Sequence, residues 1–339
     1  MSALALLLAA ALAAGGAAPA KGGAAEPHRN AKAAPAGQGA IPEPVPAGLT
    51  VASGRVERIA AFPSKNVPPR NVDVWLPEGY PDRGPYAVLY MHDGGALYDA
   101  AIMWNHQEWR VDETASKLIA GSETRPFIVV GVWNAMAERQ SEYLPQKPFE
   151  RMPEDARASL LAAKFDDGRP LYVGAVRSDA YLRFLVEELK PWVDKHYRVA
   201  TGAADTAIMG SSMGGLISVY AICEYPNVFG AAAAMSTHWP GGFGSDDGPF
   251  PQAMRAYLAQ HLPDPKTHRI YFDHGTATLD AMYPMLQKKV DAVMREEGYD
   301  EHSWQTRVFE GAEHSENSWA ARLAVPLEFA LPPRNPAGD

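Results

Sequence analysis

Segment 210–215, with the sequence GSSMGG, constrains the fold of this chain more than any other feature. It has the pattern G-x-S-x-G, and it lies between a short apolar run at 206–209 and a helix-like segment at 216–222. A strand, a tight turn and a helix form the context in which this pattern strains the serine backbone and exposes its hydroxyl above a sheet. The glycines leave room for that turn. We therefore predict that Ser212 is a nucleophile; the alternative is a glycine-rich loop without chemistry.

Buried strands and helical segments alternate along the chain. Apolar or alternating runs that predict strands occur at 51–62, 70–76, 86–91, 127–132, 206–209, 231–235, 270–272 and 306–309. Helical patterns occupy 180–197, 280–297 and 317–329. The two early strands are predicted to be antiparallel, and the continuous apolar runs are typical of strands buried on both faces. This order predicts an α/β fold with a mostly parallel central sheet flanked by helices.

The N-terminal region has the composition of a targeting segment. Residues 4–14 form an Ala/Leu run too short to span a membrane, and Ala-Pro-Ala at 18–20 resembles a signal-peptidase site. We expect a signal peptide over 1–20, a disordered linker over 21–47, one folded domain over 48–332 and a tail over 333–339. A proline-rich, charged insertion is expected over 144–178, which could serve as a lid. The mature protein is expected in the periplasm or outside the cell, without a membrane span.

The net charge argues against one class of partner, and the cysteine count excludes a disulfide within the chain. The formal net charge is −9, which argues against a nucleic-acid partner because such a partner requires a basic surface. Cys223 is the only cysteine, so no intrachain disulfide can form. We expect its thiol to be buried in the helix that follows Ser212.

A serine hydroxyl needs a base to remove its proton and an acid to orient that base. His314 follows the last predicted strand and is the expected base, whereas His302 precedes that strand. Asp280 lies beyond the glycine turn after strand 270–272 and is the expected acid. Asp273, at the end of that strand, is the alternative, and Asp280 could instead cap the following helix.

The oxyanion that forms during acyl transfer needs two backbone N–H donors. Met213, directly after the nucleophile, is expected to supply one. Gly95 is expected to supply the other, with Gly94 as the second choice, because both follow the buried run that ends at Met91. His92 and Asp93 alone do not make a metal site, so neither a metal nor a cofactor is expected.

Together these segments resemble the esterase family that includes enterochelin esterase, feruloyl and acetylxylan esterases, S-formylglutathione hydrolase and the mycolyltransferases. The markers are Tyr-Met-His-Asp-Gly at 90–94, Trp-Asn at 104–105, Arg139 with Glu-Tyr-Leu-Pro at 142–145, GSSMGGL at 210–216, Asp-His-Gly-Thr at 273–276 and Gly-Ala-Glu-His at 311–314. The resemblance covers about 51–331. It implies a single α/β-hydrolase domain without a separate cofactor, and it supports Ser212 and His314 together with the N–H groups of Gly95 and Met213. It supports the acid less closely, because positions 277 and 278 are Ala and Thr.

These observations predict an exported serine esterase that acts on an acyl or hydroxycinnamoyl carbohydrate ester, or on a siderophore lactone. The alternatives are an acyltransferase of the mycolyltransferase kind and a non-catalytic binding protein on the same scaffold. Trp104, His238 and Trp239 are expected to contact substrate, although core packing is equally compatible with a tryptophan. Arg139 and Glu142 are expected to form a structural ion pair beneath the site.

Overall fold

The computed structural model describes residues 43–44, 49–244 and 246–334. The predicted signal peptide and most of the predicted linker and tail lie outside these residues. Within them, nine strands form one sheet in the order β1-β2-β3-β5-β4-β6-β7-β8-β9. The strands are β1 (Glu43–Pro44), β2 (Arg55–Phe62), β3 (Arg70–Leu76), β4 (Ala87–His92), β5 (Phe127–Val132), β6 (Thr206–Ser211), β7 (Ala231–Met235), β8 (Arg269–Gly275) and β9 (Trp304–Phe309).

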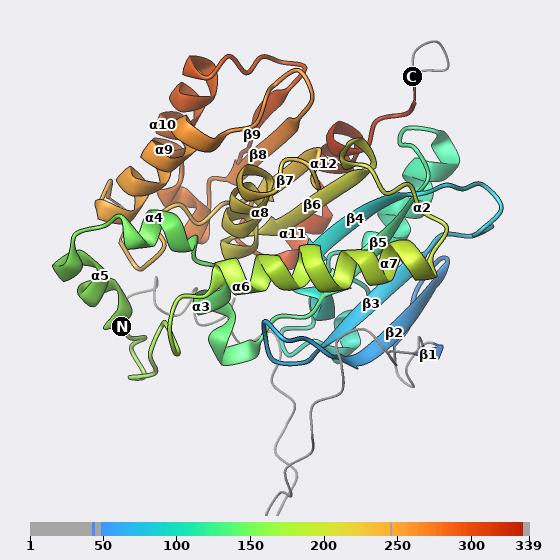
Figure 1. Cartoon of the computed structure of the whole chain (residues 1–339), viewed down its shortest axis with the longest axis horizontal. Helices are drawn as coiled ribbons and strands as arrows, with labels where there is room; N and C mark the ends of the chain where they lie inside the picture. Colours follow the sequence, from blue (N-terminus) through green and yellow to red (C-terminus); the bar gives the residue numbers. More distant parts are fainter. Residues whose placement is uncertain (1–42, 45–48, 245, 335–339) are drawn as a thin grey trace, which may run out of the picture.

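The sheet is antiparallel at one side and parallel through the rest of its width. The pairs β1/β2, β2/β3 and β3/β5 are antiparallel, whereas β5, β4, β6, β7, β8 and β9 pair in parallel. The carboxyl ends of the parallel strands therefore share one edge, where open α/β sheets place their ligand sites. Figure 1 shows these strands fanning across the centre of the molecule.

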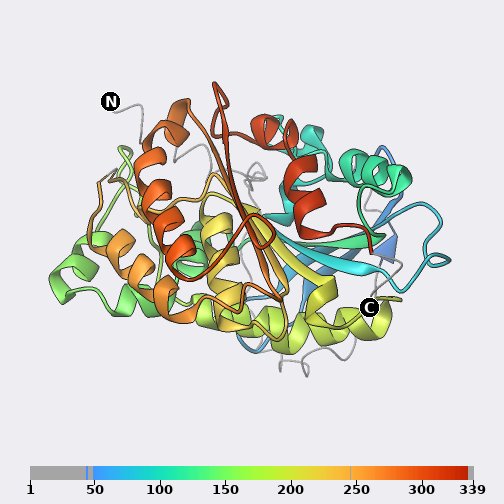
Figure 2. The ribbon, with the colours of Figure 1, turned by 90° about the horizontal axis from the view of Figure 1, so that it is seen from above.

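Helices cover both faces of the sheet (Figures 1 and 2). The α-helices are α2 (Val111–Gly121), α3 (Arg139–Tyr143), α4 (Gln146–Glu150), α5 (Glu154–Leu161), α6 (Ser178–Arg183), α7 (Lys190–His196), α8 (Met213–Glu224), α9 (Pro249–His261), α10 (Pro284–Glu296), α11 (Glu316–Ala320) and α12 (Ala324–Ala330). The helices α6, α7 and α8 lie on one face, and α2, α11 and α12 lie on the other. The predicted arrangement of a mostly parallel sheet flanked by helices is confirmed.

Alternate side chains of each strand enter the two halves of the core. In β4, Val88 and Tyr90 pack in the cluster shared with α6 and α8, whereas Leu89 and Met91 pack in the cluster shared with α2 and α12. Burial on both faces explains why the central strands are continuous apolar runs. Cys223 is a free, buried thiol in α8, as predicted, and burial raises its pKa.

All three predicted helices differ in the structure: the one expected over 180–197 consists of α6, a π-helical stretch at Phe184–Leu189 and α7. The helix expected over 280–297 begins only at Pro284, because residues Thr278–Met282 form a separate 3-10 helix, η6. The helix expected over 317–329 is divided into α11 and α12. Pro326 explains this division, because it has no N–H and is tolerated in the first turn of α12 but not in the middle of one continuous helix.

The segment 144–178 contains α4 and α5 and packs against the loop that follows β7. The Phe165 and Phe243 rings lie 5.3 Å apart, and the Tyr172 hydroxyl donates a hydrogen bond to the Gly241 carbonyl. Leu144 is fully buried. These contacts place the segment beside the β7–α9 connection at the carboxyl edge of the sheet.

Candidate active site

Ser212 occupies a strained turn between β6 and α8. Its φ of 57° and ψ of −122° lie in a region that side-chain-bearing residues rarely adopt. Three backbone hydrogen bonds hold this conformation: the Ser212 N–H donates to Met235 O at 2.9 Å, and the N–H groups of Leu216 and His238 both donate to Ser212 O at 3.1 Å. Such over-determined strain is typical of functional positions.

The glycines around Ser212 permit close approach of the strand and the helix. A Cβ on Gly210 would lie 2.8 Å from the carbonyl carbon of Gly214, so a side chain there would force the backbone apart. On Gly214, a Cβ would lie 3.4 Å from Asp93 and from His92. The turn therefore packs directly against the loop that follows β4.

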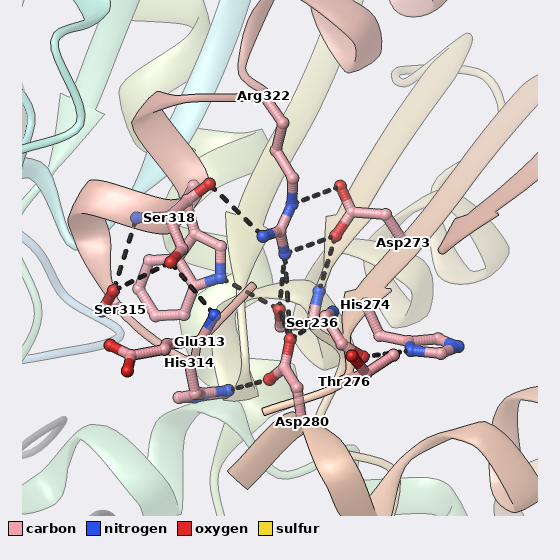
Figure 3. A network of polar contacts seen from close by, with 12 residues as sticks. Ser236, Asp273, His274, Thr276, Asp280, Glu313, His314, Ser315, Ser318 and Arg322 are labelled. Atoms are coloured by element: carbon pink, nitrogen blue, oxygen red, sulfur yellow. Dashed lines mark hydrogen bonds and ion pairs between the residues drawn. The ribbon is translucent and has the colours of Figure 1, made fainter. Parts of the chain in front are cut away.

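His314 lies in the loop between β9 and α11, and Asp280 lies in η6 after β8. The His314 Nδ1 and an Asp280 carboxylate oxygen are 2.6 Å apart (Figure 3). The other Asp280 oxygen accepts hydrogen bonds from Ser236 Oγ and the Gly275 N–H, each at 2.6 Å. Burial raises the pKa of the Asp280 carboxyl, but the bonds from His314, Ser236 and Gly275 outweigh burial and lower it. Asp280 is therefore an anion held in one orientation.

The contacts of Asp273 and Asp280 also bear on two alternatives: that Asp273 is the acid, and that Asp280 caps a helix. Asp273 points toward Arg322, whose Nε and Nη2 donate to its two oxygens at 3.2 and 3.0 Å. Among the described residues, no hydrogen bond joins Asp273 to His314. Asp280 is not a helix cap either, because Tyr283 precedes α10 and the Asp280 side chain does not bond to that helix. The capping interpretation was wrong because η6 separates Asp280 from the helix.

Ser236 connects the two aspartates to their neighbours. Its hydroxyl donates to Asp280 and accepts from Arg322 Nη2 at 2.8 Å and from Trp319 Nε1 at 3.0 Å. The Trp319 ring also stands edge-on to the His314 ring, with centroids 5.0 Å apart. Sequence reasoning did not identify Ser236 or Arg322, because a serine after β7 and an arginine in the α11–α12 connection carry no motif.

The loop after β4 contains a short 3-10 helix, η1 (Gly94–Ala96). Gly94 lies so close to β5 that a Cβ would come within 2.5 Å of the Gly131 backbone. Ala96 N–H donates to Asp93 O, so the N–H of Gly95 precedes the first internal bond of this turn. Met213 is the first residue of α8, and its N–H likewise has no intrahelical acceptor. The backbone N–H groups of Gly95 and Met213, the two predicted oxyanion donors, thus lie in first turns that contain no acceptor for them.

Asp93 fixes the position of this loop. Arg139 donates to both Asp93 oxygens at 2.7 Å, and Asn134 donates to one at 2.8 Å. Burial raises the pKa of Asp93, but the Arg139 charge and these bonds lower it below its ordinary value. The predicted pairing of Arg139 with Glu142 is therefore wrong. Glu142 instead binds both terminal nitrogens of Arg70 at 2.8 Å, because the two side chains of α3 face different elements.

The three predicted substrate-contacting residues differ in exposure. The Trp104 side chain is 40% exposed, and the adjacent Asn105 donates to Glu316 at 2.9 Å. His238 and Trp239 are buried in the interior. The Trp239 indole donates to Gln287 at 2.8 Å and packs on Phe272, which favours core packing as its role.

His92, which the sequence places beside Asp93, contacts another buried side chain. His92 is buried and its Nδ1 lies 2.8 Å from the Tyr181 hydroxyl; burial lowers its pKa to about 3. Across residues 49–244 and 246–334, no three His, Cys, Asp or Glu side chains are grouped so that they could hold a metal ion.

No helix in the described part of the chain is long and apolar enough to cross a membrane.

A separate cavity of about 890 Å³ lies at the opposite edge of the sheet. Its lining includes Arg125, Gly230 and Arg269, which precede or begin β5, β7 and β8. It is therefore remote from the carboxyl edge and from Ser212.

Comparisons with known proteins agree with this architecture. The family model for esterases, described as Putative esterase, matches residues 68–329. The chain is 22% identical over 268 residues to the uncharacterized protein YbbA of Bacillus subtilis (strain 168), which covers 77% of this chain and 92% of YbbA.

Solved structures show the same fold. One is the CE1 ferulic acid esterase AmCE1/Fae1A from the anaerobic fungus Anaeromyces mucronatus, with a TM-score of 0.55, 18% identity and coverage of 85% of this chain and 96% of that chain. Another is the enterobactin esterase FES from Shigella flexneri, with a TM-score of 0.54, 18% identity and coverage of 83% and 60%. These similarities confirm the α/β-hydrolase fold and the family resemblance.

Proposed function

Because the chain belongs to the Putative esterase family, we propose that it is an exported serine esterase that forms an acyl-enzyme on Ser212. The observation that carries this proposal is the 2.6 Å contact between His314 Nδ1 and Asp280, at the same carboxyl edge of the sheet as the strained turn that holds Ser212. His314 Nε2 is buried and has no hydrogen-bond partner among the described residues, so it is available to exchange a proton with the reacting groups.

In the proposed reaction, Ser212 Oγ attacks the ester carbonyl while His314 Nε2 takes its proton. Asp280 keeps the His314 proton on Nδ1 and stabilises the imidazolium that forms. The N–H groups of Gly95 and Met213 stabilise the oxyanion of the tetrahedral intermediate. His314 then protonates the leaving alcohol, and water deacylates the enzyme by the reverse proton path. Neither a metal nor a cofactor enters this scheme.

We propose the chemical class of the substrate rather than a single compound. The ferulic acid esterase and the enterobactin esterase share this fold, and their names give two candidates, a hydroxycinnamoyl ester and a siderophore lactone. Acyl esters of carbohydrates belong to the same proposal. Trp104 is 40% exposed, and its neighbour Asn105 bonds to Glu316, two residues after His314, so Trp104 is the proposed apolar contact for the substrate.

Hydrolysis of a short-chain p-nitrophenyl ester tests the proposal. The wild-type protein should turn over the ester, and Ser212→Ala should lose that activity while remaining folded. Ser211→Ala is the matched control, because it removes the neighbouring buried hydroxyl from the end of β6 and should keep most of the activity. Equal rates in wild type and Ser212→Ala would refute the nucleophile. A panel of methyl ferulate, an acetylated sugar and a trilactone, with and without an alcohol acceptor, then separates hydrolysis from acyl transfer.

A further inference from the structure

The mechanism above gives no role to the buried serine beside Asp280. Ser236 is fully buried. Its hydroxyl has three hydrogen-bond partners, which are Asp280 Oδ2 at 2.6 Å, Arg322 Nη2 at 2.8 Å and Trp319 Nε1 at 3.0 Å. Figure 3 shows Ser236 between Arg322 and Asp280. Three partners are the full capacity of a serine hydroxyl, which has one proton and two lone pairs.

The direction of each of these hydrogen bonds follows from the chemistry of the partners. The Arg322 guanidinium and the Trp319 indole can only donate, so they occupy both lone pairs of Ser236 Oγ. The single hydroxyl proton must therefore point to Asp280, whose carboxylate can only accept. Ser236 thus holds one carboxylate oxygen of Asp280, while the other oxygen accepts from His314.

Ser236 also connects the acid to the ring of the base. Trp319 donates to Ser236 and stands edge-on to the His314 ring, with centroids 5.0 Å apart. His314 Nδ1 in turn lies 2.6 Å from Asp280. The four side chains therefore form a closed cycle of contacts, and they come from the end of β7, from η6, from the β9–α11 loop and from α11. Such a cycle fixes both the position and the plane of the imidazole.

Arg322 supports Ser236 without taking Asp280 away from His314. Its Nη2 lies 3.0 Å from an Asp273 oxygen but 3.8 Å from the nearest Asp280 oxygen. Asp273 also accepts from Arg322 Nε at 3.2 Å and from the Ser236 backbone N–H at 3.2 Å. The Asp273 carboxylate thus directs the guanidinium toward Ser236 rather than toward the acid of the triad.

We propose that Ser236 is a positioning residue that orients Asp280, and through it His314, for proton transfer. The inference rests on the proposed function, because it assigns a residue to the same reaction. All three bonding positions of Ser236 Oγ are taken by protein groups, so none is left for substrate. Loss of the hydroxyl should therefore lower kcat and leave KM unchanged.

The test is the hydrolysis of a p-nitrophenyl ester by Ser236→Ala. We expect kcat to fall by about tenfold to a hundredfold, the range for one hydrogen bond to a charged group, while KM stays within about twofold. Ser303→Ala is the matched control, because it removes a buried hydroxyl that donates to the Asp300 carboxylate at 3.2 Å, beside the cavity at the opposite edge of the sheet. Its kcat should equal that of wild type. An unchanged kcat in Ser236→Ala would overturn the inference.

A double-mutant cycle separates positioning from a purely structural role. In the Asp280→Asn background, Ser236→Ala should change kcat by less than about twofold, because Ser236 acts only through the Asp280 carboxylate. A serine that merely supported the fold would lower kcat by the same factor in both backgrounds, and that result would contradict the proposal.

A second variant decides the question if Ser236→Ala does not fold. Ser236 has a φ of 44°, which glycine adopts readily, so Ser236→Gly removes the hydroxyl and relieves the backbone. It should show the same loss of kcat at unchanged KM, and a wild-type kcat would overturn the inference. Equal rates in wild type and Ser212→Ala would instead refute the proposed function, so the two failures are distinguishable.

Discussion

At the scale of single residues, Asp280 and Asp273 are two buried carboxylates with different partners. Asp280 orients His314, whereas Asp273 neutralises Arg322. Asp280→Asn places an amide where Ser236 and Gly275 both donate, and it removes the negative charge that favours the His314 cation. We expect kcat for ester hydrolysis to fall by about 10⁴-fold, the size of effect seen when a triad acid becomes an amide.

Asp273→Asn should have a different effect. It leaves the buried Arg322 guanidinium without its main anion, and breaking such a pair costs about 3–5 kcal/mol of folding stability. Urea unfolding should reveal that loss, while the kcat of the folded fraction stays within about tenfold of wild type, well short of the loss expected for a triad acid. If Asp273→Asn remained stable but lost as much kcat as Asp280→Asn, the assignment of the acid would be wrong.

At the scale of elements, the turn between β6 and α8 depends on Gly210. An alanine Cβ there would lie 2.8 Å from Gly214 backbone, which cannot move aside as a flexible side chain could. We expect Gly210→Ala to reduce the free energy of unfolding by about 1–3 kcal/mol, the usual cost of overpacking. Chemical denaturation measures this value.

Gly202→Ala is the control for that substitution. Gly202 has a negative φ of −77°, and a Cβ there meets no atom within 4 Å. The free energy of unfolding of Gly202→Ala should differ from that of wild type by less than about 0.5 kcal/mol. Equal losses in the two variants would mean that glycine flexibility, rather than the close approach at Gly210, sets the cost.

At the same scale, some strands and turns could be predicted from the sequence alone, whereas one helix and one ion pair could not. The strands β4, β5 and β7 were recognisable because burial on both faces produces continuous apolar runs, and the G-x-S-x-G pattern located the turn at Ser212. The helix α9 was missed, although Phe250, Met254, Tyr257 and Leu258 have helical spacing and are buried. The partner of Arg139 could not be predicted, because Asp93 lies 46 positions away and meets it only when β4 and β5 pair.

At the scale of the whole molecule, acid should weaken the native state through Asp280. Its folded-state pKa lies below the ordinary value of 3.8, so its contribution to stability is fully present above about pH 4 and is lost as pH falls through the folded pKa. The difference in unfolding free energy between wild type and Asp280→Asn should therefore shrink from pH 7 to pH 3. A difference that stayed constant or grew would contradict the lowered pKa.

The proposed export also concerns the whole chain. If residues 1–20 are a signal peptide, cleavage after Ala20 leaves Lys21 as the first residue. Intact-mass measurement of protein recovered from the periplasm or the medium should give that N-terminus. A full-length mass in the cytoplasmic fraction would contradict export.

The order in which the sheet is completed has a consequence for synthesis. Ser212 follows β6, Asp280 follows β8, and His314 follows β9, the edge strand that pairs only with β8 among the described strands. The proposed base therefore joins the nucleophile only after the whole parallel half of the sheet has formed. By the proposed mechanism, a partly made or unfolded chain has Ser212 without a positioned proton acceptor, so it cannot carry out the ester hydrolysis that we propose for the folded protein.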